Sequence, residues 1–278
     1  MSPPSPLAAL SHRLPAGVAA AAEPLAAEVR ADRARLPVVF PGIPRRTSRD
    51  AVRGGRTQLG PGTIDLDAFR VCDLAAAHLL LAIAATEAEI HDLYQHGDLD
   101  ERAMLLRALH FLPVSPTTTR LFGEVQRTNM VVHLEAAICD GDLFARTVGQ
   151  AGFDLPTANK LLLKVAFLDL PLRRLYGAER HANPELSRML QDLATEREAA
   201  GRSVWRDTNR LIARAVVPGT IARLLGGLEH GDDATRLAAA EGLLVLNRKD
   251  LRPFAAERLA REPRADVRTV LQQLTAAN

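Results

Sequence analysis

Strong helix-start signals recur at short intervals along this chain, and they restrict the fold to short helices joined by tight turns. Thr86-x-x-Glu89 and Asp98-x-x-Glu101 have the spacing of a capping box, in which each side chain accepts a hydrogen bond from the other residue's backbone N–H. Asn183-Pro184-Glu185 combines an N-cap, a first-turn proline and a first-turn acid. Short helices paired in this way predict stacked helical hairpins.

The apolar content also favours helices over strands. Aromatic residues make up only 4% of the chain while hydrophobic residues reach 47%, so most of the apolar surface comes from Ala and Leu. These residues lose little conformational entropy in a helix, whereas strands favour branched and aromatic side chains. We therefore predict an all-α fold of stacked helical hairpins, a HEAT-like or irregular α-solenoid.

Three regions are expected along the chain. Residues 1–62 read as an N-terminal helical segment with a Pro/Arg/Gly-rich loop, residues 63–215 as a central helical region, and residues 216–278 as HEAT-like repeats, with 63–278 forming one continuous domain. The repeat prediction rests on Asp233-Ala-Thr-Arg236 and Asp266-Val-Arg268, whose aspartates lie 33 residues apart and precede apolar helices.

The stretch from Pro37 to Gly62 is expected to lack helix. Three prolines between Pro37 and Pro44 each remove a backbone donor and restrict the preceding residue. Residues Arg45 to Gly62 are polar, basic and rich in glycine, which predicts a loop. Two interpretations of the Arg45–Arg56 segment stay open: a disordered surface loop, or a lid that grips an anion.

Several features point to a cytoplasmic protein. Cys72 and Cys139 lack the spacing of a disulfide framework or zinc site, so we expect buried thiols in a reducing compartment. The start of the chain has no pattern of a secretory signal. The longest apolar run, Val71 to Ala85, is short for a membrane span and contains Asp73. A formal charge of only +2 gives no reason to expect a nucleic-acid partner.

Polar residues interrupt the segment from Phe122 to Ile138, which we predict to be one helix, apolar almost all round. Arg127, Asn129 and His133 fall on or beside its apolar faces, and buried polar groups need partners. One interpretation is a structural hydrogen-bond network. The other is a pocket in which Arg127 and Asn129 bind a small molecule while His133 acts as acid or base, assisted by Glu124.

Two further basic residues are candidates for binding an anionic substrate. Lys164 lies on an otherwise apolar helix, where it either extends its ammonium to water or holds a carboxylate or phosphate. Arg174 belongs to the basic connector from Asp169 to His181, which Pro171 and Gly177 interrupt. We predict both as substrate-binding residues.

An ordered series of motifs runs from Glu124 to Arg202. It consists of Glu124-x-x-Arg127-Thr128-Asn129-Met130, Asn159-x-x-x-x-Lys164, Pro171-Leu172-x-Arg174, Ala182-Asn183-Pro184-Glu185-Leu186-x-Arg188-Met189-Leu190 and Glu196-Arg197-x-Ala199-Ala200-Gly201-Arg202. In order and spacing this series resembles the EboA family. The upstream Phe40-x-x-x-Pro44-Arg45 is similar to an early motif of that family.

The resemblance implies a helical protein of bacterial specialised-metabolite clusters, whose members accompany prenyltransferase-like, sugar-phosphate-cyclase-like and barrel-fold proteins. It implies a role in maturing a metabolite or moving it toward the cell envelope. The sequence departs from the family pattern at several positions. Cys139-Asp140-Gly141-Asp142 stands where Asn-Asn-Pro-Tyr is expected, Thr195 and Glu198 where His and Trp are expected, and Asn209 where another Trp is expected. These departures predict a changed ligand or function.

Motifs for nucleotide, phosphate-loop, metal and serine-hydrolase chemistry are absent from the sequence. We therefore expect no cofactor and no metal. Three hypotheses remain. The protein binds a small biosynthetic intermediate between helices and transforms it or leaves it unchanged; it is a cofactor-free isomerase, cyclase or lyase that uses His133 with Arg127, Asn129 and Glu124; or it is a helical scaffold for other pathway enzymes or export proteins.

Overall fold

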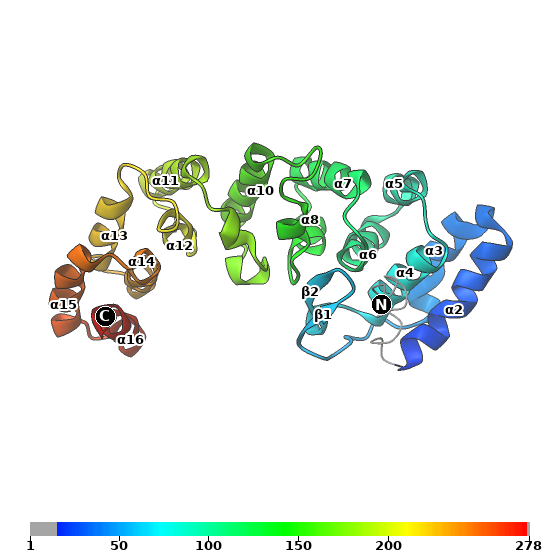
Figure 1. Cartoon of the computed structure of the whole chain (residues 1–278), viewed down its shortest axis with the longest axis horizontal. Coiled ribbons are helices and arrows are strands. Elements are labelled where there is room, and N and C mark those ends of the chain that lie inside the picture. The colour runs from blue at the N-terminus through cyan, green and yellow to red at the C-terminus, as the bar shows by residue number, and fades with distance from the viewer. Residues whose placement is uncertain (1–15, 277–278) are drawn as a thin grey trace, which may run out of the picture. The chain divides into compact units, whose positions relative to one another are not determined.

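The computed structural model describes residues 16–276, and nearly all of its regular structure is helical (Figure 1). The longer helices are α2 (Ala16–Ala31), α3 (Leu36–Arg46), α4 (Val71–Ala82), α5 (Glu87–His96), α6 (Leu99–Ala108), α7 (Pro116–Arg127), α8 (Val131–Ile138), α9 (Leu143–Thr147), α10 (Leu155–Phe167), α11 (Pro184–Ala199), α12 (Thr208–Ile212), α13 (Thr220–Leu228), α14 (Asp233–Leu246), α15 (Arg252–Arg261) and α16 (Ala265–Ala276).

Short 3-10 helices connect several of these elements: η1 (Arg33–Arg35), η2 (Leu66–Ala68), η3 (Leu109–Phe111), η4 (Leu172–Arg174), η5 (Ala178–His181) and η6 (Lys249–Leu251). One antiparallel hairpin, β1 (Arg56–Leu59) with β2 (Gly62–Asp65), is the only sheet among the described residues. The predicted all-α class is confirmed. The start of the predicted segment 1–62, with its expected lack of a secretory signal, lies outside the described residues.

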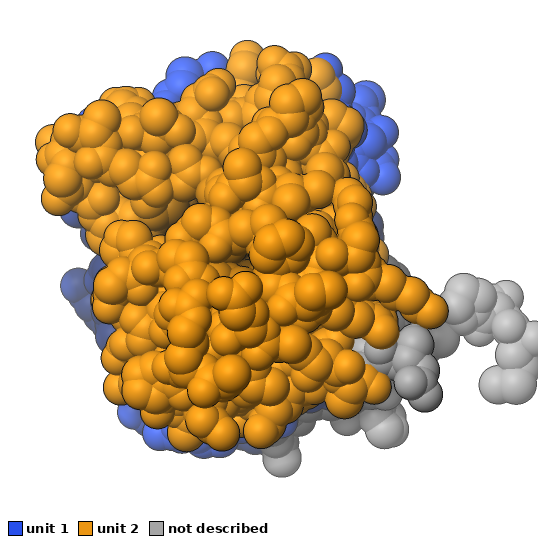
Figure 2. All heavy atoms as spheres, turned by 90° about the vertical axis from the view of Figure 1, so that its left-hand side faces the viewer, with its two compact units in different colours: residues 1–155, 173–178 blue, residues 156–172, 179–278 orange. Residues whose placement is uncertain are grey.

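The chain divides into two compact units, coloured separately in Figure 2. Unit 1 comprises residues 1–155 and 173–178, and unit 2 comprises residues 156–172 and 179–278. The chain therefore leaves unit 1, returns to it for six residues and then continues in unit 2. The domain boundaries predicted after residues 62 and 215 remain predictions.

Within each unit the helices stack as consecutive hairpins. In unit 1, α2, α4, α6 and α8 contact one another in series, while α5 packs on α6 and α7, and α7 on α8 (Figure 1). In unit 2, the pairs α11–α12, α13–α14 and α15–α16 form hairpins, and α12, α14 and α16 contact in series. The similarity of these hairpins to HEAT repeats remains a prediction.

The predicted helix caps are present. The Thr86 hydroxyl accepts a hydrogen bond from the Glu89 N–H at 3.3 Å, and the Glu89 carboxylate accepts one from the Thr86 N–H at 2.8 Å. Asp98 and Glu101 form the same reciprocal pair. The Asn183 side chain accepts from the Leu186 N–H at 3.0 Å at the start of α11. Local sequence therefore fixes where these three helices begin.

The prediction that residues Pro37 to Pro44 exclude helix is wrong, because they form most of α3. Pro37 occupies the first turn, where a backbone donor is not needed. Pro41 and Pro44 fall on the same side of the helix as Pro37, whereas the buried residues Leu36, Val39, Phe40 and Ile43 recur at three- and four-residue steps on another side. Burial of that apolar face outweighs the lost backbone hydrogen bonds.

The loop predicted from Arg45 to Gly62 is also partly wrong, because Arg56–Leu59 is a strand that pairs with β2. The hairpin turns at Gly60, which has a φ of +61°. A Cβ atom at this position would lie 3.1 Å from the Phe111 carbonyl oxygen, so both the backbone conformation and the space favour glycine. A role of the Arg45–Arg56 segment as a lid remains a prediction.

The single helix predicted from Phe122 to Ile138 is instead two helices. Helix α7 ends at Arg127, Thr128 is extended, and α8 begins at Val131. The Thr128 hydroxyl accepts a hydrogen bond from the Met130 N–H at 3.2 Å, which replaces a helical bond by a local one. Because of the break, the residues that follow point in other directions than they would in one continuous helix, and Met130 and Val132 are exposed.

A buried histidine lies at the centre of unit 1. His110 is fully buried, and its Nε2 atom is 3.1 Å from the Ala136 carbonyl oxygen, to which it donates. Its Nδ1 atom has no hydrogen-bond partner among the described residues and faces Gly141, where an added Cβ would lie only 2.4 Å away. The site accommodates a neutral imidazole, and a second N–H would have no acceptor.

We predict that His110 makes unit 1 sensitive to acid. Burial, with a smaller contribution from the Arg146 charge, lowers the pKa of His110 from 6.5 to about 4. Because the unfolded chain binds this proton more readily, stability is complete above pH 6.5 and falls as the pH approaches 4. The expected loss is about 3 kcal/mol, at ~1.4 kcal/mol per unit of pKa difference.

The measurement is guanidinium unfolding of His110→Gln and of the unchanged protein at pH 7 and at pH 4.5, followed by circular dichroism. The variant should be less stable at pH 7, and its further loss on acidification should be clearly smaller. An equal loss in both proteins would show that another group controls the acid response.

A buried ion cluster ties the last hairpins of unit 2 together. The Glu262 carboxylate is almost fully buried and accepts hydrogen bonds from Arg236 Nε at 3.0 Å and Arg258 Nη2 at 2.7 Å. Burial opposes ionisation of Glu262. Hydrogen bonds from Arg236, the Arg264 N–H and Arg258 outweigh that effect and lower the pKa to about 2. The cluster therefore stabilises the fold above about pH 4.5 and loses this effect as the pH falls toward 2.

We predict that Glu262→Gln destabilises unit 2 by about 3 kcal/mol, since it removes the buried carboxylate that two guanidiniums share. Arg236 and Arg258 keep as partners the more exposed carboxylates of Asp233 and Glu229. The only tryptophan of the sequence, Trp205, is buried in unit 2, so its fluorescence reports the unfolding of this unit. Asp250→Asn, which breaks an exposed ion pair with Arg248, is the control and should have a far smaller effect. Similar losses in both variants would contradict the prediction.

Candidate functional site

The predicted site residues of the α7–α8 region do not form a single cluster. Glu124 and Arg127 form an ion pair on the last turn of α7, with the Arg127 Nη2 atom 2.7 Å from Glu124 Oε1 and the arginine side chain 72% exposed. Asn129 is exposed in the link before α8. His133 is buried, and its Nε2 atom lies 3.0 Å from the Leu99 carbonyl oxygen at the start of α6.

These contacts give His133 a place in the packing of α8 against α6 and give the Glu124–Arg127 pair a surface position. Exposed pairs of this kind contribute about 0 to 1 kcal/mol. The structure brings Glu124 and Arg127 together but leaves His133 in a different contact. The catalytic and binding roles assigned to these residues and to Asn129 remain predictions.

Arg174 is already engaged by two carboxylates. Its Nε and Nη2 atoms lie 2.9 and 2.6 Å from the two oxygens of Asp140, and its Nη1 atom contacts Glu135 on α8. These contacts, chiefly the hydrogen bond with Asp140, raise the pKa of the Arg174 guanidinium above its ordinary value. Lys164 belongs to α10 in unit 2 and is half-buried, and burial lowers the pKa of its ammonium group. Their substrate-binding roles likewise remain predictions.

The departure Cys139-Asp140-Gly141-Asp142 forms a junction between distant segments of unit 1. The Asp65 N–H donates to the Asp140 carbonyl at 2.8 Å, and the Tyr176 N–H donates to the Gly141 carbonyl at 3.0 Å. Asp142 accepts from Arg146 and from the Thr63 N–H. These four residues therefore contribute to the packing of unit 1.

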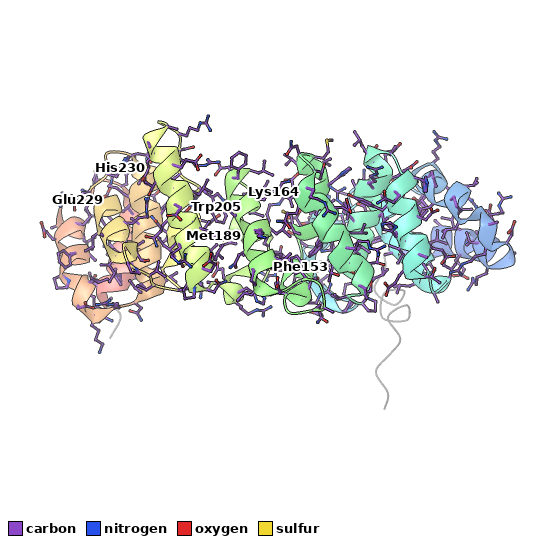
Figure 3. The ribbon with its side chains drawn as sticks, turned by 90° about the horizontal axis from the view of Figure 1, so that it is seen from above. Phe153, Lys164, Met189, Trp205, Glu229 and His230 are labelled. Carbon is purple, nitrogen blue, oxygen red and sulfur yellow. The ribbon has the colours of Figure 1, made fainter. Side chains whose placement is uncertain are left out.

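A large cavity lies within unit 2, as a groove of about 1210 Å³. Its walls are α11, the connection from Gly201 to Arg206, and α13 with the start of α14. Trp205 and His230, labelled in Figure 3, both belong to its lining. We call this cavity the α11–α14 groove. It contains none of the six predicted site residues.

Side chains cross-brace the two walls of the groove. The Gln191 amide donates to the Thr220 hydroxyl at 3.2 Å. Arg223 on α13 donates to both carboxylate oxygens of Glu198 on α11, at 2.7 and 3.1 Å, and to the Thr195 hydroxyl at 3.1 Å. The three residues of α11 are spaced by four and three positions and so share one face. The braces hold the groove in a defined shape.

The inner surface of the groove combines small apolar residues with polar groups. Trp205 is 2% exposed and donates from its indole Nε1 to the Leu170 carbonyl at 2.9 Å, which fixes the ring. Gly226 on α13 has no heavy atom within 4 Å of an added Cβ, so its missing side chain leaves space open. Neighbouring Gly227 instead packs closely on Ala239 of α14. Such a surface suits an apolar ligand with polar substituents.

Sequence reasoning missed this groove, although it noted three of its residues. Thr195, Glu198 and Asn209, the positions where His, Trp and Trp were expected, all line it. They come from α11 and α12, and their coincidence in one cavity was not visible from the sequence. The sequence contained one partial signal: Thr195 and Glu198 lie three residues apart and so share one face of the predicted helix.

The lining offers hydrogen bonds and charge, with one histidine. The His230 Nδ1 atom accepts a hydrogen bond from the Asp232 N–H at 3.0 Å, so this nitrogen is occupied within the loop before α14. Among residues 16–276, no group of three or more His, Cys, Asp and Glu side chains is arranged to hold a metal ion. The arrangement is equipped for binding by shape, hydrogen bonds and charge.

Comparison with known families decides the relationship of the chain. Residues 65–213, more than half of the 278, match the family described as Metabolite traffic protein EboA. The chain belongs to the EboA family. The resemblance inferred from the motifs between Glu124 and Arg202 is thereby confirmed. A search of curated proteins and a search of solved structures each found no match.

The family match ends at Ala213, within unit 2. It includes α11 and the connection from Gly201 to Arg206, but α13 and α14 lie beyond it. One wall of the groove therefore belongs to the family region and the other to the C-terminal hairpin. Within residues 16–276, no helix has the length and apolar character required to cross a membrane.

Proposed function

We propose that this EboA-family protein binds a small metabolite in the α11–α14 groove. The observation that carries the proposal is the groove itself, which has a volume of about 1210 Å³ and one wall inside the family match. Ligand pockets for small organic molecules typically measure ~300 to 1,000 Å³. The groove is therefore large enough for a metabolite with a carbon skeleton of considerable size.

The structure of the walls supports binding without chemical change. Across the groove, Arg223 pairs with Glu198 and Thr195, and Asp232 caps α14. A protein that transports or protects a metabolite needs such a preformed site. In this proposal the ligand is an intermediate of bacterial specialised metabolism, the protein works in the cytoplasm, and other enzymes of the same pathway are its partners.

Catalysis by His133 and Glu124 is the second of the predicted functions. Their contacts, with Leu99 and Arg127 respectively, lie in unit 1, whereas the groove lies in unit 2. No residue of the groove was among those predicted for acid–base chemistry. The geometry therefore favours metabolite binding, and a cofactor-free isomerase, cyclase or lyase activity stays a separate prediction.

We predict that Gly226→Trp blocks the groove. The indole would project into open space, because no heavy atom lies within 4 Å of the added Cβ, so the helix should fold as before. The probe is N-phenyl-1-naphthylamine, a neutral dye that fluoresces in apolar sites, titrated with excitation above the tryptophan absorption. Its dissociation constant should rise by about tenfold or more, equivalent to at least ~1.4 kcal/mol.

The matched control is Gly123→Trp. Gly123 lies on α7 in unit 1 and is likewise a helical glycine with nothing within 4 Å of an added Cβ. This variant adds the same indole to the protein surface and should leave dye binding unchanged. Equal binding by the unchanged protein and Gly226→Trp would reject the groove as the binding site, as would equal losses in the two variants.

A further inference from the structure

We infer that the α11–α14 groove selects anionic ligands, in which a carboxylate or phosphate is attached to an apolar skeleton, and that Arg223 binds the anion in exchange for Glu198. The inference rests on the proposed metabolite-binding function of the groove. It specifies the chemical class of the ligand and the residue that recognises its charge.

The charge balance of the lining favours an anion. Four arginines line the groove, namely Arg188, Arg202, Arg206 and Arg223, against the three carboxylates Asp192, Glu198 and Asp232. Asp232 is committed to α14, where it accepts from the Thr235 N–H and hydroxyl, and these bonds lower its pKa. An excess of guanidinium groups on a concave surface attracts anions and raises their local concentration.

Two of these arginines have little competition for their charge. Arg202 forms no ion pair with any residue in the described part of the chain, and the nearest carboxylate to Arg206 is Glu241 at 4.0 Å. Both belong to the exposed connection after α11. Arg188, by contrast, pairs with Glu185 one turn away on the same helix. Arg202 and Arg206 are therefore available to attract an anion toward the groove.

Arg223 is the best-positioned receptor for that anion. Its guanidinium holds the Glu198 carboxylate in a two-pronged contact at 2.7 and 3.1 Å, the geometry in which arginine binds carboxylates and phosphates. The arginine side chain is only 18% exposed, whereas the Glu198 side chain is 50% exposed. The arginine is thus fixed in the wall while its carboxylate partner lies at the open side.

Exchange of Glu198 for a ligand anion has a small energetic cost. The arginine remains neutralised by an oxyanion, and the half-exposed Glu198 returns to water, where it is well solvated. Because Glu198 is half exposed to water, it loses little when it leaves Arg223, so a ligand with additional apolar contacts can displace it. Those contacts are available at Gly226, Ala234 and Ala238, which also line the groove.

The test uses two dyes that differ in one anionic group. N-phenyl-1-naphthylamine is neutral, and 1-anilinonaphthalene-8-sulfonate is the same aromatic pair carrying a sulfonate. The full-length protein should bind the sulfonated dye at least about fivefold more tightly, and this ratio should decrease as salt is added. Arg223→Gln should reduce the ratio to near one and leave the neutral dye bound. Glu198→Gln should increase it, because it frees the guanidinium.

Two further variants make the assignment specific. Arg188→Gln removes one positive charge from the groove at a residue that pairs with Glu185. It should reduce the preference for the sulfonated dye over the neutral dye much less than Arg223→Gln does. Arg223→Lys keeps the charge without the planar fork and should give an intermediate ratio, which also tests the inference if Arg223→Gln fails to fold. Equal effects of Arg188→Gln and Arg223→Gln would overturn the assignment to Arg223.

The outcomes separate this inference from the proposed function. If neither dye binds the unchanged protein, the proposed function itself fails. If both bind equally tightly, the groove still binds small molecules and the anion preference is overturned. A separate competition experiment measures displacement of the sulfonated dye from the protein. Stronger displacement by dodecanoate or dodecyl phosphate than by dodecanol supports the inference, and equal displacement by the alcohol contradicts it.

Discussion

The backbone hydrogen bonds around Gly141 join three segments of unit 1 that are far apart in the sequence. Residues 140–142 pair with β2 on one side and with residues 174–176 on the other, through bonds of 2.6 to 3.0 Å. His110 occupies the space where a side chain at position 141 would lie. Any larger residue there would push the histidine away and separate the segments, so the packing of unit 1 depends on this one glycine.

The same junction explains why six residues of the connector return to unit 1. Arg174 adds its bonds to Asp140 and Glu135, and the Arg56 guanidinium lies 3.9 Å from the centre of the Tyr176 ring. A basic connector that looks solvent-exposed in the sequence is therefore held by carboxylates and an aromatic ring. Its charge is used within the fold, which leaves less of it for a substrate.

Sequence predicted best those features that depend on neighbouring residues. Thr86, Asp98 and Asn183 begin helices because each cap is made within four residues of itself. The failures involve partners far away in the chain. The prolines of α3 are tolerated because Phe40 and Ile43 are buried by other helices, and the β1–β2 hairpin is held by residues 140–142, which pair with β2. Neither partner can be read from the local pattern.

The site was harder to predict for a related reason. Arg127, Asn129 and His133 stood out because one continuous apolar helix was assumed, and the break at Thr128 removes that argument for Arg127 and Asn129. Groove residues such as Thr195 and Arg223 look like ordinary surface positions in their own helices. They line one cavity because α11 and α13 are held together by hydrogen bonds between positions 191 and 220 and between positions 198 and 223.

The two walls of the groove differ in their relation to the family match. The α11 wall lies inside the family match and the α13–α14 wall lies outside it, so the groove is complete only when both are present. Arg223 belongs to the second wall, yet it holds Thr195 and Glu198, two of the positions that depart from the family pattern. In the proposed function the ligand is therefore specified by the pair of walls, and the family match covers only one of them.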